Sequence, residues 1–365
     1  MIEPLPPGST IGIVGGGQLG RMLAMAAARL GYRTAILEPD RDCPAAQVAN
    51  LHIAAAYDDA RALERFIQAC DVVTYEFENV PVETARTLAE RVTVHPAVEA
   101  LEMAQDRLWE KIFFNSMGIE TAPFASVETL QQLEDELRRF GGNGVLKTRR
   151  MGYDGKGQCY LREASDEAVK RALESFGDAP LILEGFIAYE REISVIAARG
   201  IDGSVAAYDI VENIHHHGIL TRSVIPASVA SSTAETAREY ATEVLSALNY
   251  VGVIGIEFFV LPDGRLLANE MAPRVHNSGH WTEAACAISQ FEQHIRAISG
   301  LPLGDTARHS DCIMENLLGA DQERTPELLK QPDLVLHLYG KAKARAGRKV
   351  GHFTRLFPRG ARKEQ

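Results

Sequence analysis

Apolar residues near the start of the chain gather in short runs that alternate with amphipathic stretches. The apolar runs are TIGIVGG (10–16), TAILEP (34–39) and DVVTYEFENV (71–80), and between them lie LGRMLAMAAARLG (19–31) and DARALERFIQAC (59–70). Continuous apolar runs are typical of strands buried on both faces, and the intervening stretches have helical periodicity. The pattern predicts a β-α-β-α-β unit, and therefore a parallel sheet covered by helices, in a domain that spans residues 1–96.

The pattern changes after this unit, first to charged helices and then mainly to strands. ALEMAQDRLWEKIFFNSMG (100–118) and VETLQQLEDELRRFG (127–141) each predict one helix. The elements predicted after them are strands at 144–148, 159–163, 179–187, 192–200, 204–215, 251–260 and 265–271, and helices at 232–248 and 282–299. We expect an α+β domain with an antiparallel sheet over 97–296 and a small β-rich domain over 297–365.

The overall charge makes some partners less plausible. The net charge is -11 and the pI is about 5.5, which argues against nucleic acid or an anionic membrane as the main partner. The exception is the segment 341–365, which carries nine Lys or Arg and one acid. This tail is either a solvated terminus or a phosphate-contacting segment.

Cysteine usage and the first residues bear on the compartment. The five cysteines include no C-x-x-C pair, and the first ten residues lack the features of a signal peptide. No run approaches the roughly 18 apolar residues of a membrane span. We therefore expect a cytoplasmic protein with reduced thiols.

The first glycine-rich loop, IGIVGGGQLGRM, satisfies G-x-G-x-x-G through Gly15, Gly17 and Gly20. It follows a predicted strand, opens a predicted helix, and Glu38 ends the next strand, as in dinucleotide-binding folds. Glycines and a helix N-terminus suit any phosphate, however. A dinucleotide, another phosphate ligand and plain strand-helix packing all remain open.

A second glycine-rich loop, MGYDGKGQ (151–158), joins two predicted strands. Three glycines and a lysine in such a loop suit a flexible flap over a polyphosphate, over about 148–160. Lys147 ends the strand just before the loop, where its ammonium group can reach phosphate oxygens. The alternative is a plain hairpin loop with a solvated lysine.

Glu257 and Glu270 lie on two apolar runs that flank a Pro-Asp-Gly turn. With a turn of four residues, 262–265, these glutamates face each other across the hairpin, with Cβ atoms about 5 Å apart. Two carboxylates so placed repel each other unless a cation lies between them or one is protonated. Oxygen ligands that also reach phosphates suit Mg²⁺, so we predict a magnesium site here.

Two other polar segments need interpretation. ANEMAPRVHNSGHW (268–281) is dense in polar side chains, and its arginine and asparagines suit the positioning of anions and substrate beside a metal. His215, His216 and His217 are consecutive, so in a strand they alternate between faces. A zinc site in this run is therefore disfavoured.

Six segments together resemble one family. GGGQLGRM, YEFENVP, KTRRMGYDGKGQ, ENIHHHGIL, NEMAPRVHNSGHWT and GRKVGH occur in the order found in ATP-grasp ligases, specifically in 5-(carboxyamino)imidazole ribonucleotide synthases of purine biosynthesis. The resemblance implies an ATP-grasp fold with a Rossmann-like pre-ATP-grasp domain. It also implies that ATP and Mg²⁺ are used to join bicarbonate to 5-aminoimidazole ribonucleotide through carboxyphosphate.

The resemblance also implies roles for individual residues. Mg²⁺ is expected at Glu257 and Glu270. The expected ATP-binding residues are Arg107, Lys147, Gly152, Tyr153, Asp154, Gly155, Lys156, Gly157, Gln158, Glu184, Gly185, Phe186, Ile187, Glu192, His215, Asn269 and Glu270. The first glycine loop is expected to hold the phosphoribosyl end of the substrate, whose contacts are Gln18, Leu19, Glu76, Asn277, Lys341, Arg348 and Lys349. The catalytic residues around bicarbonate and carboxyphosphate are expected to be Tyr153, Asp154, Arg274, His276 and Lys349.

Three alternatives are weighed at this point. A non-catalytic nucleotide-binding module is expected to lack the metal carboxylates, and both are present here. Another is a different ATP-grasp ligase acting on formate or biotin, such as a formate-dependent glycinamide ribonucleotide transformylase, which shares the ATP site and differs in the YEFENVP and GRKVGH segments. The third is a dinucleotide-dependent dehydrogenase, which leaves the second loop and the glutamate pair unexplained. The family resemblance further implies a homodimer, and the acidic composition leads us to expect no nucleic-acid or membrane partner.

Overall fold

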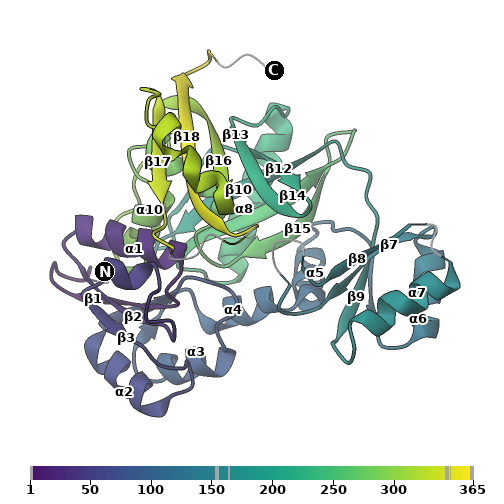
Figure 1. Cartoon of the computed structure of the whole chain (residues 1–365), viewed down its shortest axis with the longest axis horizontal. Coiled ribbons are helices and arrows are strands. Elements are labelled where there is room, and N and C mark those ends of the chain that lie inside the picture. The colour runs from purple at the N-terminus through teal and green to yellow at the C-terminus, as the bar shows by residue number, and fades with distance from the viewer. Residues whose placement is uncertain (1–2, 153–155, 163–164, 342–344, 346, 362–365) are drawn as a thin grey trace.

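The N-terminal part of the chain forms the predicted parallel sheet. The computed structural model describes residues 3–152, 156–162, 165–341, 345 and 347–361, and within them the first sheet has five parallel strands in the order β3-β2-β1-β4-β5 (Figure 1). Its elements are β1 (Thr10–Val14), α1 (Gln18–Arg29), β2 (Arg33–Leu37), η1 (Ala45–Gln47), β3 (Leu51–Ile53), α2 (Ala60–Ala69), β4 (Val72–Tyr75), α3 (Val82–Ala89) and β5 (Thr93–Val94).

Local signals in the sequence set the ends of these elements. Gly31 follows α1 with a φ of 81°, a left-handed conformation that glycine adopts without strain. Asp59 begins α2, and its carboxylate accepts a hydrogen bond from the Ala62 N–H at 2.9 Å. Strands β3 and β5 are only three and two residues long, which is too short for their hydrophobic pattern to predict them.

The middle of the chain forms two helices and a separate antiparallel sheet. In the described part of this region the sheet has four strands in the order β6-β9-β7-β8, covered by α6 and α7, and it projects to the right in Figure 1. The elements are α4 (Val98–Gln105), α5 (Arg107–Ser116), β6 (Phe124–Val127), α6 (Leu130–Arg139), β7 (Asn143–Thr148), β8 (Gln158–Arg162), α7 (Asp166–Ser175) and β9 (Leu181–Gly185).

The single helix predicted over residues 100–118 is wrong. The chain leaves the helix at Asp106, which has an extended backbone and separates α4 from α5. The Asp106 carboxylate accepts hydrogen bonds from the Leu108 N–H and from the guanidinium groups of Arg149 and Arg150. These partners stabilise the break and start α5 at Arg107.

The rest of the chain builds the largest sheet. Its strand order, in the described residues, is β15-β14-β10-β12-β13-β16-β18-β17, and β11 pairs with β10. The elements are β10 (Arg191–Arg199), β11 (Val205–Ala207), β12 (Val211–His216), β13 (Ile219–Ile225), α8 (Ser231–Ala247), β14 (Gly252–Val260), β15 (Leu266–Ala272), η2 (Asn277–Gly279), α9 (Thr282–Ala285), α10 (Gln290–Ile298), β16 (Ser310–Leu318), η3 (Gly319–Arg324), α11 (Thr325–Leu328), β17 (Leu334–Leu338) and β18 (Lys349–Pro358).

Two predictions in this region need correction. The helix predicted over 282–299 is two helices, α9 and α10, because Ser289 caps a new helix by accepting a hydrogen bond from the Glu292 N–H. The strand predicted over 204–215 is split into β11 and β12. The helix predicted over 232–248 is confirmed as α8, within one residue at each end.

Two apolar cores cover the two faces of the large sheet. One core joins Leu23 of α1 to Ile295 of α10 and to Ile196 of β10, so the N-terminal domain packs directly on this sheet. The other joins α5 and α8 to β14. Together they hold the first glycine loop, the start of α5 and the β14-β15 hairpin in fixed relation.

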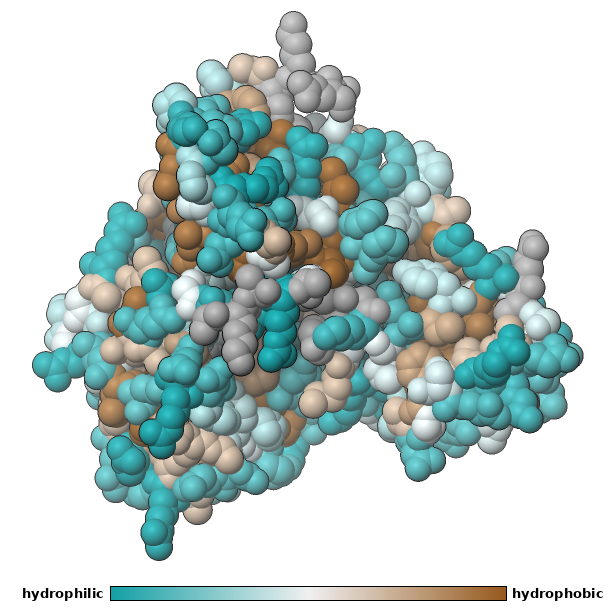
Figure 2. Space-filling view, viewed as in Figure 1, coloured by the Kyte–Doolittle hydropathy of each residue, from teal (hydrophilic) through white to brown (hydrophobic). Residues whose placement is uncertain are grey.

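The outer surface fits the charged composition. Figure 2 shows a face dominated by hydrophilic residues, with apolar residues in small groups among those described. No helix in the described ranges is long and apolar enough to cross a membrane.

Candidate active site

The hairpin of β14 and β15 brings Glu257 directly opposite Glu270, as predicted. The route to this pairing differs from the prediction, because Val260 pairs with Leu266 and the turn is one residue longer than expected. A β-bulge, in which Asn269 is the extra residue, then shifts the register by one and restores the pairing. The bulge therefore aligns the two carboxylates.

The two facing carboxylates, Glu257 and Glu270, lie in an unfavourable electrostatic environment. Burial, and then the negative charge of Glu270, raise the pKa of Glu257 to about 7. Burial and the same Glu270 charge raise the pKa of Glu110, on α5, to about 8. Three carboxyl groups so close together favour a bound cation. A set of carboxylate oxygens fits Mg²⁺, which prefers oxygen ligands, so Glu257 and Glu270 could hold that ion.

One face of α5 supplies cationic groups to this site. Arg107 Nη1 lies 3.2 Å from Glu270 Oε2, and Lys111 Nζ donates a hydrogen bond to the Asn269 carbonyl at 3.3 Å. Glu110 accepts the Met271 N–H at 2.7 Å and thereby ties α5 to β15. Sequence reasoning missed Glu110 and Lys111, although residues 107, 110 and 111 share one helical face.

Lys147 and Lys111 share a carboxylate partner. Glu184 Oε2 lies 2.9 Å from Lys147 Nζ and 3.3 Å from Lys111 Nζ. Burial raises the pKa of Glu184, but the two ammonium groups outweigh it and lower this pKa to about 2. The pair of lysines at the end of β7 and on α5 is thus held in place, and its excess positive charge suits phosphate oxygens.

Glu192 and His215 face each other from β10 and β12. His215 Nδ1 lies 2.7 Å from Glu192 Oε2. Burial lowers the pKa of His215, but its hydrogen bond to Glu192 and the charge of Glu257 outweigh this and raise it. Ligand atoms of Glu192, His215 and Glu257 all lie within 4.8 Å of one another, which places the first two residues at the predicted magnesium site.

Arg274 and His276 follow β15 and reach the same place. The Arg274 guanidinium is paired with Glu78, a partner that sequence reasoning missed although it lies in the YEFENVP segment. His276 Nε2 lies 3.6 Å from Glu257 Oε1. Burial, and then the charge of Arg274, lower the pKa of His276 to about 3, so its ring is neutral at physiological pH.

A buried line of hydrogen bonds fixes His276 from behind. Its Nδ1 lies 2.8 Å from the hydroxyl of Ser278, which accepts a hydrogen bond from the Ser194 hydroxyl at 2.7 Å. The Asn213 amide donates to Ser194, and the Ser223 hydroxyl donates to Asn213. Sequence reasoning missed this line because small polar residues inside strands give no periodic signal.

The first glycine loop binds a carboxylate of the chain itself. Glu76 accepts the Gly17 N–H at 2.6 Å and the Gly20 N–H at 2.9 Å. The Gly16 N–H is donated to Glu38, which also accepts the Tyr57 hydroxyl. The acid that a dinucleotide site would use for a ribose is therefore engaged within the protein. Gln18 and Leu19, the predicted substrate contacts, begin α1 beside this loop.

The basic tail returns to the site from the C-terminal strands. Lys349 begins β18, and its charge offsets a small part of the rise in the pKa of Glu257 and adds to the effects of burial and Arg274 that lower the pKa of His276. Lys341 Nζ donates to the Lys349 carbonyl at 2.7 Å. Arg348 is exposed and directly precedes Lys349. The structure thus brings this end of the chain to the carboxylates.

Other predicted residues connect with this centre to different degrees. Asn277 exchanges two amide hydrogen bonds with Asn316 of β16. Gly185, Phe186 and Ile187 end and follow β9, where the Arg162 guanidinium lies 4.3 Å from the Phe186 ring centroid. The flap enters at Gly152 and leaves through Lys156, Gly157 and Gln158, and Gln158 pairs with Lys147. Tyr153, Asp154 and Gly155 lie outside the described residues.

Three family profiles match successive parts of the chain. The ATP-grasp domain matches residues 112–291, and the ribonucleotide synthetase preATP-grasp domain matches residues 9–105. The phosphoribosylaminoimidazole carboxylase C-terminal domain matches residues 312–364. The three profiles together cover most of the chain.

Curated relatives and solved structures resemble nearly the whole chain. An N5-carboxyaminoimidazole ribonucleotide synthase of Brucella melitensis is 62% identical over 97% of this chain and 98% of the relative, and that of Pseudomonas aeruginosa is 46% identical over 94% and 93%. A crystal structure of N5-carboxyaminoimidazole ribonucleotide synthetase with ADP has a TM-score of 0.94 at 40% identity, covering 98% and 94%. An Aspergillus clavatus synthase with ADP and 5-aminoimidazole ribonucleotide has a TM-score of 0.90 at 31% identity, covering 96% and 94%. The chain therefore belongs to the N5-carboxyaminoimidazole ribonucleotide synthase family of ATP-grasp ligases.

Proposed function

We propose that the chain uses ATP to join bicarbonate to the exocyclic amine of 5-aminoimidazole ribonucleotide, giving the N5-carboxylated ribonucleotide, ADP and phosphate. Family membership makes the chain an ATP-dependent ligase of purine biosynthesis that forms a carbon-nitrogen bond. The observation that carries the assignment is the facing pair Glu257 and Glu270, surrounded by Arg107, Lys111 and Lys147. Such a centre suits a metal-bound polyphosphate.

ATP is assigned to the space between the four-stranded sheet and the β14-β15 hairpin. Lys147 and Arg107 supply positive charge to the phosphates, and the segment that follows Glu184 borders the adenine. Glu192 accepts the ribose hydroxyls, with His215 beside it. Mg²⁺ bound at Glu257 and Glu270 supplies charge neutralisation at the phosphate oxygens where phosphoryl transfer needs it.

The reaction is proposed to take place in two steps. A bicarbonate oxygen first forms a bond to the γ-phosphorus of ATP as the bond to ADP breaks, which gives carboxyphosphate. The amine nitrogen then bonds to the carboxyl carbon as phosphate leaves and the amine loses a proton. Arg274 supports this sequence by offering a fixed positive charge, and His276 by presenting a neutral ring, beside the same carboxylates. Tyr153, Asp154 and Lys349 are assigned to the same step.

The ribonucleotide is assigned to the first glycine loop. Gln18 and Leu19 at the start of α1 face its phosphoribosyl end, where the helix dipole and the N–H groups other than those of Gly17 and Gly20, which donate to Glu76, favour an anion. Glu76 and Asn277 line the same pocket, and the basic residues Lys341, Arg348 and Lys349 close it. We further propose that the enzyme acts as a cytoplasmic homodimer.

Release of ADP tests this assignment directly. Purified protein is given Mg-ATP and bicarbonate, with and without 5-aminoimidazole ribonucleotide, and ADP and the carboxylated product are quantified. We expect product formation that requires both bicarbonate and the ribonucleotide. ATP turnover that instead requires formate and glycinamide ribonucleotide would transfer the chain to the transformylase reaction. Tight NADH binding with intact ATP would support the dehydrogenase alternative.

Matched variants locate the reaction at the hairpin. Glu257→Gln removes a proposed metal ligand, whereas Glu235→Gln changes an exposed carboxylate on α8 that pairs with Arg238. We expect loss of turnover in the first variant only. Equal activity in the two variants would separate the reaction from the hairpin carboxylates.

A further inference from the structure

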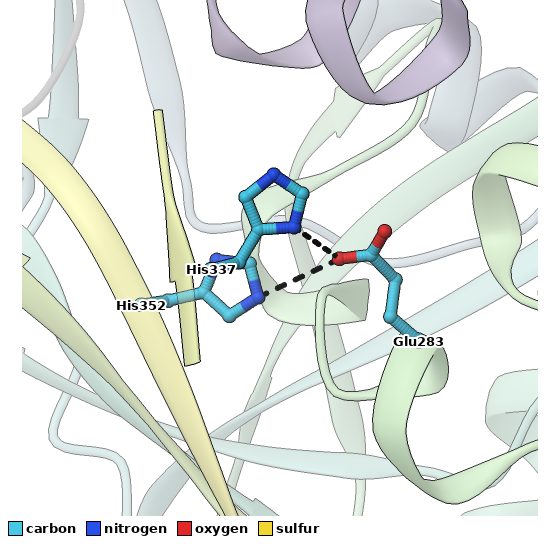
Figure 3. Close-up of side chains that lie close together, drawn as sticks. All are labelled: Glu283, His337 and His352. Carbon is cyan, nitrogen blue, oxygen red and sulfur yellow. Dashed lines mark hydrogen bonds and ion pairs between the residues drawn. The ribbon is translucent and has the colours of Figure 1, made fainter. Parts of the chain in front are cut away.

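A second cluster of metal-ligating side chains lies on the C-terminal strands, separate from the hairpin carboxylates. Glu283 of α9, His337 of β17 and His352 of β18 point toward one another, as Figure 3 shows. His337 and His352 are directly opposite in the antiparallel register, which brings side chains on one face close together. Three separate elements therefore contribute one ligand atom each.

The spacing of the three side chains matches a transition-metal site. His337 Nδ1 lies 3.1 Å and His352 Nε2 lies 3.7 Å from the same oxygen, Glu283 Oε2 (Figure 3). Tetrahedral zinc with bonds of about 2.1 Å holds its ligand atoms about 3.4 Å apart. The two distances lie on either side of that value, so small side-chain rotations suffice to coordinate an ion.

A hydrogen bond outside the cluster orients one of the two histidines. His352 Nδ1 lies 2.9 Å from the Tyr339 hydroxyl, the kind of outer hydrogen bond that orients a metal-bound histidine. His352 Nε2, the nitrogen on the side of Glu283, is left to face the ion. His337 faces the same oxygen, Glu283 Oε2, through Nδ1, which is therefore the atom that would coordinate the ion.

A cavity of about 160 Å³ adjoins the cluster, and Glu283, His337 and His352 are among its lining residues. His280 lines it too, is fully buried, and has an Nε2 without a hydrogen-bond partner among the described residues. Gln290 Nε2 lies 3.1 Å from His280 Nδ1 and also donates to the His276 carbonyl, so Nδ1 accepts and Nε2 carries the proton. A buried donor without a partner beside the cavity favours an acceptor there, such as a metal-bound water.

We propose that Glu283, His337 and His352 bind a Zn²⁺-class divalent ion, with a water as fourth ligand next to His280. Two imidazoles and one carboxylate suit zinc, cobalt or nickel better than magnesium. The ion would cross-link α9, β17 and β18. Lys341 follows the end of β17, and Lys349 begins β18. The bound ion would therefore hold in place the two strands next to these lysines.

Cobalt binding tests the proposal with a readout independent of turnover. Tag-free full-length protein, freed of metal by chelation, is titrated with Co²⁺ in the presence of excess Mg²⁺, and visible absorption typical of tetrahedral cobalt is followed. We expect one Co²⁺ per chain, displaced by Zn²⁺, and a Zn²⁺-dependent rise of several degrees in the midpoint of thermal unfolding.

Variants assign the binding to one cluster. His337→Ala and Glu283→Gln change partly exposed side chains, and both are expected to abolish the cobalt band and the thermal shift while the folded state persists by circular dichroism. His215→Ala, at the hairpin carboxylates, is expected to keep both. The proposal is overturned if wild-type protein takes up no cobalt at millimolar concentration, or if His215→Ala loses the band while His337→Ala retains it.

Discussion

The first glycine loop and the β14-β15 hairpin both concentrate carboxylates, and they treat them in opposite ways. At the loop, burial raises the pKa of Glu76, but two backbone N–H groups donate to its carboxylate and offset part of that rise. At the hairpin, Glu257 faces Glu270, and burial and this like charge raise the pKa of Glu257. The hydrogen bonds of Glu76 stabilise the folded loop. The repulsion between Glu257 and Glu270 destabilises the hairpin until a cation binds between them.

The same substitution at the two places is therefore expected to have opposite effects. At the hairpin, Glu270→Gln removes a proposed Mg²⁺ ligand and a charge that repels Glu257 and Glu110, at the loss of an ion pair with Arg107. We expect turnover to fall by roughly a thousandfold or more, which corresponds to about 4 kcal/mol of lost transition-state stabilisation, while the thermal midpoint without Mg²⁺ stays level or rises. ADP release and differential scanning calorimetry measure the two quantities, and a variant that is both active and less stable would remove the contrast.

At the glycine loop, Glu76→Gln places an amide where two N–H groups need acceptors. One donor loses its partner, so the free energy of unfolding is expected to fall by about 2 kcal/mol. Chemical denaturation checks this value. Glu90→Gln, an exposed carboxylate at the end of α3, serves as control and is expected to change little. Equal stability of the two variants would show that the loop does not depend on its internal carboxylate.

The pH dependence of stability provides a third way to sharpen the comparison. Because the pKa of Glu257 is about 7 in the folded state and about 4.5 in the unfolded state, the folded state binds more protons between these values. Stability without Mg²⁺ should therefore decrease as pH rises through this window, by about 3 °C in the thermal midpoint. Glu270→Gln removes part of the cause and should flatten the slope. A wild-type slope no steeper than that of the variant would contradict the expectation.

The smallest expected effect is at a second carboxylate of the N-terminal domain that accepts a backbone N–H. Asp59 caps α2 through the Ala62 N–H, so Asp59→Ala is expected to cost about 1 kcal/mol of unfolding free energy. Asp58→Ala is the matched control, because it removes an exposed carboxylate directly next to the cap. Urea denaturation distinguishes them, and equal losses would mean that the cap contributes nothing specific.

Periodicity predicted the parallel sheet, α8 and the hairpin well, because each has a long apolar or amphipathic pattern. It failed at Asp106, where hydrogen bonds from Arg149 and Arg150 stabilise a break in the helix. The helical pattern of the sequence does not reveal this break. It also failed for β3, whose three residues are too few to show alternation. The local hydrophobic pattern is thus sufficient to predict long helices and strands. It is insufficient where side chains distant in the sequence determine where a helix ends.

The candidate site shows the same division. The facing of Glu257 and Glu270 was correct, although a longer turn and the bulge at Asn269 produced it together. The burial of Glu110 and Lys111 was missed, because charged residues on a helix usually face solvent. Only the approach of α5 to β15 turns these two side chains inward, and that approach depends on long-range packing.

The large sheet runs without interruption from β13 into β16 and β18, although separate family profiles cover these strands. The C-terminal segment that contains β16 and β18 is therefore not an independent module, and recombination cannot exchange it without disturbing the large sheet. A swapped segment would have to restore the pairing of Ile225 with Cys312 and its neighbours along the ladder. Without a strand that pairs as β16 does, the backbone N–H and C=O groups along the edge of β13 would be exposed and could pair with another chain, which leads to aggregation. Gene fusions that retain this segment intact should therefore outnumber those that replace it.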